Sequence, residues 1–176
     1  MLNSPAQAFF QTNTKQAEVL YSHVMQVAGL TGAEVVFDLY CGTGTIGLFC
    51  AHKAKQVIGI EINESAVESA RGNALKNSIT NASFYLGGVD QRLNELKEKP
   101  DVVIVDPPRA GLEGNVVAKC AAFGAAKIVY VSCNPSTMAR DLKLFAEKGY
   151  TTRMIQPVDM FPQTYHVENI ALLTKN

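Results

Sequence analysis

Segments with the hydrophobic pattern of a β-strand alternate with segments of helical periodicity along most of this 176-residue chain. The expected strands are 34–39, 56–60, 82–86, 101–105 and 127–132, and the helices expected after them are 46–52, 64–76, 91–97, 115–123 and 136–147. A further helix is expected over 15–28, capped by Asn13 or Thr14, with Val19, Leu20, Val24 and Val27 on its buried stripe. Because a crossover between parallel strands needs about a dozen residues and is right-handed, the alternation predicts a doubly wound α/β sheet covered on both faces.

The C-terminal part of the chain breaks this rhythm. Two strand-like runs, 150–159 and 166–174, are joined by residues 160–165 with no helical segment between them. So short a connection predicts an antiparallel pair. We therefore expect a seven-stranded, mostly parallel sheet with an antiparallel last strand, in a single domain spanning 1–176.

Composition excludes several classes of protein. The chain is 47% hydrophobic and 18% charged, which is typical of a globular domain, and 16 basic residues balance 16 acidic ones, so no large cationic field drives binding to polyanions. The longest apolar runs, such as 35–37, are too short to span a membrane, and the N-terminus does not resemble a secretory signal. A cytoplasmic protein is expected. The four cysteines form no C-x-x-C pair, which disfavours a metal or iron–sulfur site.

A glycine-rich turn follows the first strand. Residues 42–47 (GTGTIG) fit G-x-G-x-x-G, and Glu61 ends the next strand, where its carboxylate can accept hydrogen bonds from a ribose diol. Asp38, on the strand before Gly42 and Gly44, would face the ligand and repel a pyrophosphate. S-adenosylmethionine has no phosphate and carries a sulfonium and an amino group that a carboxylate favours. We therefore predict this methyl donor as the ligand; a nicotinamide dinucleotide and a turn without any ligand are the alternatives.

Cys133 follows the fifth strand, at the edge of the sheet where open α/β proteins bind ligands. The sequence after it, Asn134-Pro135-Ser136, begins a helix whose free amides and dipole would stabilise a thiolate. Cys133 is thus a candidate nucleophile. The three other cysteines, at 41, 50 and 120, are interpreted as buried hydrophobic side chains.

Further candidate residues follow the fourth strand and begin the seventh. Asp106 precedes Pro107-Pro108-Arg109 and lies at the same edge of the sheet as Cys133 if the fourth and fifth strands are neighbours. Its carboxylate could orient an amide-like ring, while Arg109 could contact a phosphate or a carbonyl. Glu168 is a candidate general base at the start of the last strand. His166 lacks a partner at metal-ligand spacing and is interpreted as structural.

Together these groups suit methylation of uracil at C5. The C5 carbon is a poor nucleophile until a thiolate adds at C6, and the resulting adduct then requires a base to remove the C5 proton. Cys133, Asp106 and Glu168 would be the nucleophile, the orienting acid and the base.

At these residues the chain resembles the RNA 5-methyluridine (uracil-C5) methyltransferases over essentially its full length. The matching segments are Phe9-Phe10-Gln11-Thr12-Asn13, Asp38-Leu39-Tyr40-Cys41-Gly42-Thr43-Gly44, Gly59-Ile60-Glu61, Asp106-Pro107-Pro108-Arg109-Ala110-Gly111, Ser132-Cys133-Asn134-Pro135 and His166-Val167-Glu168. The resemblance implies a Rossmann-like class I fold dependent on S-adenosylmethionine and the roles given above for Cys133, Glu168 and Asp106. It also implies a cofactor site that includes Gln11, Tyr40, Glu61 and the glycine turn.

The resemblance extends the expectations to substrate and domain organisation. It implies an RNA substrate, with rRNA expected over tRNA. A monomer without metal is also expected. Members of this family usually carry an N-terminal RNA-binding barrel and a central domain, and this sequence begins where the catalytic domain would begin. The segment 87–90 departs from the family pattern, and Asp90 is proposed to substitute for an acid expected directly after the glycine.

Three other functions share part of this pattern. An adenine-N6 type amino-methyltransferase also places Asp or Asn before two prolines but follows them with an aromatic residue, where Arg109 stands here. An RNA cytosine-C5 enzyme would be expected to carry a cysteine at that position. A non-catalytic module that binds S-adenosylmethionine would have no use for Cys133 and Glu168.

Overall fold

The computed structural model describes residues 14–160, 163–164 and 167–176, and the side chains of Thr14 and Lys15 are outside this description. The strands are β1 (Val35–Leu39), β2 (Gln56–Glu61), β3 (Ala82–Leu86), β4 (Val102–Val105), β5 (Lys127–Ser132), β6 (Tyr150–Val158) and β7 (Glu168–Lys175). The helices are α1 (Thr14–Ala28), α2 (Thr45–Ala51), α3 (Glu64–Lys76), α4 (Val89–Arg92), α5 (Gly114–Phe123) and α6 (Pro135–Glu147).

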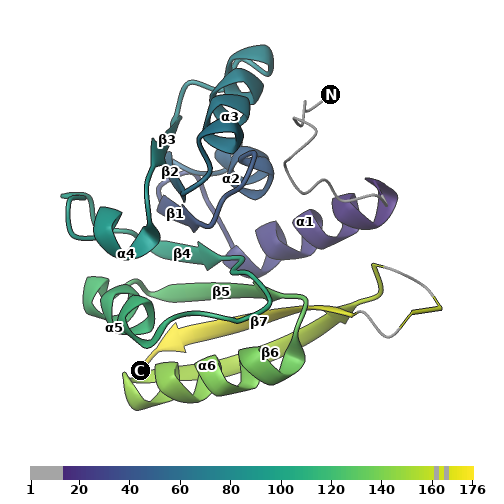
Figure 1. Cartoon of the computed structure of the whole chain (residues 1–176), viewed down its shortest axis with the longest axis vertical. Helices are drawn as coiled ribbons and strands as arrows, with labels where there is room; N and C mark the ends of the chain where they lie inside the picture. Colours follow the sequence, from purple (N-terminus) through teal and green to yellow (C-terminus); the bar gives the residue numbers. More distant parts are fainter. Residues whose placement is uncertain (1–13, 161–162, 165–166) are drawn as a thin grey trace.

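The seven strands form one sheet in the order β3-β2-β1-β4-β5-β7-β6 (Figure 1). All neighbouring pairs are parallel except those made by β7, which runs antiparallel to both β5 and β6. This confirms the mostly parallel, doubly wound sheet with an antiparallel last strand. The insertion of β7 between β5 and β6 was not part of the prediction.

Alternating side chains of each strand point to opposite faces of the sheet, and each face has its own helices. On one face, Val36, Ile104 and Val129 pack with apolar side chains of α1 and α2, and a smaller cluster there joins α3 to β3. On the other face, Phe37, Val103 and their neighbours pack with α4, α5 and α6. Asp38 has the parity of Val36, so its side chain lies on the face that α2 covers.

Two details of the predicted helices are wrong. Val19 is 42% exposed, because the buried stripe of α1 runs through Ala17, Leu20, Val24 and Ala28 instead. The helix expected over 91–97 is the single turn α4, Val89–Arg92. Beyond Arg92 the chain continues as turns and irregular structure, although Leu93 is buried and Leu96 packs against the same core cluster. No helix among the described residues is long and apolar enough to cross a membrane.

Candidate active site

The glycine-rich turn joins β1 to α2 at the carboxyl edge of the sheet. The backbone turns there through positive φ angles at Tyr40 (62°), Gly42 (53°) and Gly44 (77°). A Cβ atom on Gly44 would lie 2.8 Å from the ring of Phe84, so both the backbone conformation and the close packing require glycine there. A Cβ atom on Gly42 would meet no other atom within 4 Å, so this turn also has open space beside it.

Glu61 connects this turn to the end of β2. Its Oε2 atom accepts a hydrogen bond from the amide of Gly42 (3.0 Å), and its Oε1 atom accepts one from the amide of Asn63 (2.9 Å). Each carboxylate oxygen has two acceptor sites, so both oxygens keep one for a ligand. The side chain is half-buried, as a group that grips a ribose diol at the mouth of a site would be.

Asp38 lies deeper than the sequence suggested. It is fully buried beneath the turn, and its Oδ2 atom accepts a hydrogen bond from the amide of Gly47 (2.8 Å). A Cβ atom on Gly47 would lie 2.7 Å from that oxygen, so α2 approaches this closely only through a glycine. The sequence predicted that Asp38 faces the ligand; its strand parity directs its side chain toward α2, so it lies beneath the turn.

The second oxygen of Asp38 is an acceptor without a donor. Among the described residues, no side chain or amide donates to its Oδ1 atom, although the atom is buried. Burial raises the pKa of Asp38 to about 7, the Gly47 hydrogen bond opposes this rise, and the charge of Glu61 adds to it. A cationic or hydrogen-bonding ligand above the turn would satisfy this acceptor. Glu61, at the end of β2, is placed to accept hydrogen bonds from a ribose of the same ligand. The residues present therefore fit S-adenosylmethionine.

Cys133 lies between β5 and α6. It is partly exposed, whereas Cys41, Cys50 and Cys120 are buried, so the distinction drawn from the sequence agrees with the structure. Asn134 caps α6, and its Oδ1 atom accepts the amide of Ser136 (3.1 Å); the hydroxyl of Ser132 accepts the amide of Asn134 (3.0 Å).

The expectation that the start of this helix lowers the pKa of Cys133 is wrong. Burial raises the pKa of the thiol, the charge of Glu168 raises it further, and the guanidinium of Arg109, which hydrogen-bonds the thiol, opposes both. The largest of these effects is burial, which outweighs any stabilisation of the thiolate by the start of α6. Arg109 is thus the group that favours the thiolate.

Strand pairing brings Glu168 and Asp106 to the same edge as Cys133. Asn169 is paired with Ser132 across β7 and β5, so Glu168 lies one residue beyond this pair, next to Cys133. Val105 is paired with Tyr130 across β4 and β5, which places Asp106 beside the same strand end. The condition set for Asp106, that β4 and β5 are neighbours, is therefore met.

The carboxyl groups of Asp106 and Glu168 resist ionisation. Burial raises the pKa of Asp106 to about 8, and the charges of Glu168 and Asp38 contribute to the rise. Burial also raises the pKa of Glu168, which is 8% exposed, while the charge of Arg109 lowers it. Two carboxyl groups with raised pKa values therefore lie on either side of the strand end that carries the thiol.

The structure adds Tyr21 to this group. The pKa of its phenol is raised to about 12 by burial and by the charge of Asp106, then by Asp38 and Glu168, while a hydrogen bond with Thr45 lowers it. The phenol of Tyr21, on α1, is therefore close enough to these three carboxyl groups for their charges to raise its pKa. Only the packing of α1 on the sheet reveals this, because the sequence gives Tyr21 no motif.

Two candidate site residues, Gln11 and Asp90, do not join the described site. Gln11 and His166, like Asn13, lie outside the described residues. Asp90 lies on α4, where Lys119 of α5 forms an ion pair with its carboxylate and donates to its carbonyl oxygen (2.8 Å). A ligand would have to compete with that cation for the carboxylate. Among the described residues there is no cluster of His, Cys, Asp and Glu that could hold a metal ion.

The arrangement of this sheet and turn is found in known proteins. A precorrin-6y C5,15-methyltransferase from Geobacter metallireducens has the same fold, with a TM-score of 0.79 over 99% of this chain and 94% of that chain, at 13% identity. The structure of the Pyrococcus abyssi tRNA (uracil-54, C5)-methyltransferase in complex with S-adenosyl-L-homocysteine matches 96% of this chain and 40% of that chain, with a TM-score of 0.83 and 40% identity. The fold is therefore that of the Rossmann-like class I methyltransferases that use S-adenosylmethionine.

The sequence comparisons define the family within this class. Residues 2–176 match the profile of the tRNA (Uracil-5-)-methyltransferase family. RNA methyltransferases of Caldanaerobacter subterraneus subsp. tengcongensis and Enterococcus faecalis are 52% and 53% identical over 96% and 97% of this chain. The chain belongs to the tRNA (uracil-5-)-methyltransferase family. It spans 38% of the length of each of these two relatives.

Proposed function

We propose that this chain transfers a methyl group from S-adenosylmethionine to C5 of a uridine in RNA through a covalent bond between Cys133 and C6 of the uracil. The observation that carries the proposal is the meeting of Cys133, Asp106 and Glu168 at one edge of the sheet, at the ends of three adjacent strands. An amino-methyltransferase would need neither the partly exposed thiol nor a base next to it.

S-adenosylmethionine supplies an electrophilic methyl group when bound. On this chain the glycine turn and Glu61 would hold its ribose side, and Asp38 beneath the turn would accept a donor from it. Tyr40 at the turn is a further candidate contact, since it lies between Asp38 and Gly42, and its half-buried side chain packs against the apolar cluster that α4, α5 and α6 cover. Asp90 stays a weaker proposal, since Lys119 already pairs with it.

The side chains divide the reaction between them. The thiolate of Cys133 adds to C6, which places an electron pair on C5 and the O4 carbonyl; C5 then takes the methyl group, and the sulfonium sulfur keeps the electrons of the broken bond. Glu168 removes the C5 proton, the C5–C6 double bond re-forms, and the thiolate leaves. The raised pKa of Glu168 suits it to accept this proton.

Asp106 orients the ring in this proposal. With a pKa of about 8, its carboxyl group is mostly neutral at pH 7. A neutral carboxyl offers one acceptor and one donor side by side, which is complementary to the N3–H and O4 of uracil. Burial thus converts a charged side chain into a group that can read the uracil edge.

RNA containing 5-fluorouridine tests this mechanism, because fluorine at C5 cannot leave as a proton. With S-adenosylmethionine present, we expect a covalent protein–RNA adduct detectable by denaturing gel and mass spectrometry. The adduct is expected to disappear in Cys133→Ala and to persist in the matched control Cys50→Ala, which removes a buried thiol elsewhere. On ordinary uridine RNA, Glu168→Gln is expected to accumulate the methylated adduct.

The outcomes of the adduct assay and of the methylation assay separate the alternative functions. An adduct that survives in Cys133→Ala would contradict the covalent mechanism. Methylation of adenine, or binding of S-adenosylmethionine without any methylation, would favour the amino-methyltransferase or the non-catalytic module. Parallel rRNA and tRNA substrates test the expected preference for rRNA.

A further inference from the structure

A polar network fixes the loop that carries Arg109 onto helix α6. Its centre is Asp141, a fully buried carboxylate of α6. The Oδ2 atom of Asp141 accepts hydrogen bonds from the amide of Leu112 (2.7 Å) and the hydroxyl of Tyr130 (2.7 Å), and its Oδ1 atom accepts one from Nε of Arg140 (2.8 Å). A buried carboxylate is stable only with such partners, so the network is an obligatory part of this packing.

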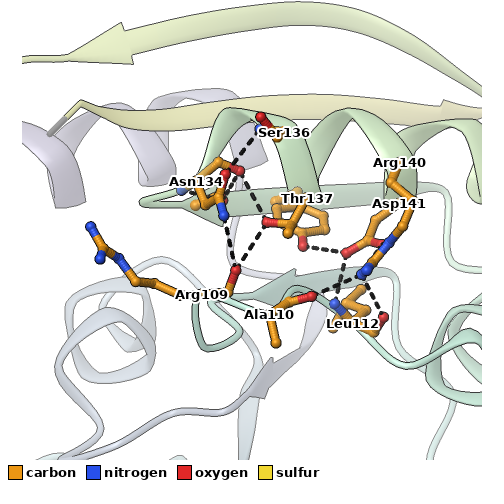
Figure 2. A network of polar contacts seen from close by, with 10 residues as sticks. Arg109, Ala110, Leu112, Asn134, Ser136, Thr137, Arg140 and Asp141 are labelled. Carbon is orange, nitrogen blue, oxygen red and sulfur yellow. Dashed lines mark hydrogen bonds and ion pairs between the residues drawn. The ribbon is translucent and has the colours of Figure 1, made fainter. Parts of the chain in front are cut away.

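Arg140 extends the network along the loop backbone. Its terminal NH2 group donates to the carbonyl oxygens of Ala110 (3.0 Å) and Leu112 (3.1 Å). The side-chain amide of Asn134 (Nδ2) and the hydroxyl of Thr137 both donate to the carbonyl oxygen of Arg109, at 3.1 and 3.3 Å. Figure 2 shows these bonds from α6 to the loop. Carbonyl oxygens at three positions between 109 and 112 are therefore held by one helix.

The loop conformation depends on close contact with these side chains. Gly111 has a φ angle of +77°, and a Cβ atom there would lie 2.6 Å from both the Arg140 NH2 group and the Asp141 Oδ2 atom. The amide of Gly111 also donates to the carbonyl oxygen of Pro108 (2.8 Å), which closes a turn. The backbone at Arg109 is thus fixed from both sides.

This arrangement determines where the positive charge of Arg109 lies. The backbone of Arg109 is bonded to the network, while its guanidinium extends away from it (Figure 2). Asn134, which holds the Arg109 carbonyl, directly follows Cys133. The charged groups that act on the thiol are Arg109 from this loop, Glu168 from β7 and Asp106 from β4; among them Arg109 alone favours the thiolate.

We propose that Arg140 and Asp141 are positioning residues, which hold the loop 109–112 on α6 so that the Arg109 guanidinium stays beside the Cys133 thiol. The purpose of this positioning rests on the function proposed above, whereas the test of it does not depend on that function. An exposed arginine on an untethered loop would sample many positions, and its effect on a neighbouring thiol would decrease. The hydrogen bonds from Arg140 and Asp141 to the loop therefore keep the charge of Arg109 in one place.

The test measures the reactivity of Cys133 itself, without RNA or methyl donor. The rate of alkylation by iodoacetamide is followed between pH 6 and 10, and peptide mass spectrometry isolates the signal of Cys133 from the three buried cysteines. In Arg140→Met we expect the midpoint of the profile to move to higher pH and the rate at pH 7.5 to fall about threefold, which corresponds to half a pKa unit. The matched control Lys143→Met removes an exposed cation from the same helix and should leave the profile unchanged.

A double variant decides between positioning and general destabilisation. Arg109→Met removes the cation, so Arg109→Met/Arg140→Met should react no more slowly than Arg109→Met alone. Gly111→Ala, which displaces the loop by another route, should reproduce the shift of Arg140→Met. A lower melting temperature with an unchanged alkylation profile in Arg140→Met would overturn the proposal, as would additive effects in the double variant. Failure of the methylation proposal would leave these alkylation results unaffected.

Discussion

Burial opposes ionisation at three neighbouring carboxyl groups, those of Asp38, Asp106 and Glu168. Each has a pKa raised first by desolvation, and Asp106 and Glu168 lie at the same edge of the sheet. The identity and approximate place of these residues could be predicted from the sequence, because strand ends determine them. Their depth could not, since the burial of Asp38 depends on α2, and the raised pKa of Cys133 depends on its burial and then on the charge of Glu168 from the far end of the chain.

The raised pKa of Asp38 makes the stability of the protein depend on pH in a defined direction. Its pKa rises from 3.8 to about 7, so the folded state holds a proton that the unfolded state releases between these values. The contribution of this group to the free energy of unfolding is complete below about pH 4 and is lost as pH rises through 7, by up to about 4 kcal/mol. Asp38→Asn, which keeps an acceptor for the Gly47 amide, should therefore lose less stability than the wild type between pH 5 and pH 8.

Urea denaturation at the two pH values measures this difference. Glu147→Gln, at the exposed end of α6, is the control and should keep the slope of the wild type. A slope in Asp38→Asn as steep as that of the wild type would assign the pH dependence to other groups.

At the scale of elements, hydrophobic periodicity predicted most of the strands and helices because each buries one face. The strand pattern of β5 and the helical pattern of α3 are examples, with bounds that agree with the structure. The exception is α4, which ends at Arg92 although Leu93 and Leu96, further along the expected helix, also pack on the core. Hydrophobic periodicity also does not predict close contacts between elements, such as the contact of α2 with β1 at Gly47.

Two helical glycines provide a matched test of that junction. Gly47→Ala places a methyl group 2.7 Å from Asp38 Oδ2 and 3.0 Å from a methyl carbon of Val57, so it should lower the free energy of unfolding by about 1–3 kcal/mol. Gly72→Ala, in α3 with no atom within 4 Å of the new methyl, should raise it by up to about 1 kcal/mol. Urea denaturation of both variants measures the two effects; stabilisation by both would show that α2 can move away from β1 at little cost.

At the scale of the whole molecule, the order of the strands in the sheet is the feature that local sequence patterns predict least well. The antiparallel pairing of β6 with β7 follows from their short connection, but the insertion of β7 next to β5 depends on contacts between residues far apart in the chain. This insertion has a direct consequence for the site. Because β7 runs opposite to β5, its first residue, Glu168, lies at the edge where β4 and β5 end. A β7 strand at the outer position would place β6 between Glu168 and Cys133.

The cofactor proposal predicts stabilisation of the whole molecule by S-adenosylhomocysteine, the demethylated product. The turn after β1 and the end of β2 belong to the centre of the sheet, so a ligand that binds only the folded state raises the free energy of global unfolding. At a ligand concentration about 100 times the Kd, the gain is about 2.7 kcal/mol, which corresponds to an increase of roughly 5–11 °C in melting temperature. Differential scanning fluorimetry measures it. Glu61→Ala should reduce the increase, whereas Glu68→Ala, an exposed acid on α3, should not. An increase with a nicotinamide dinucleotide and none with S-adenosylhomocysteine would reverse the assignment of the ligand.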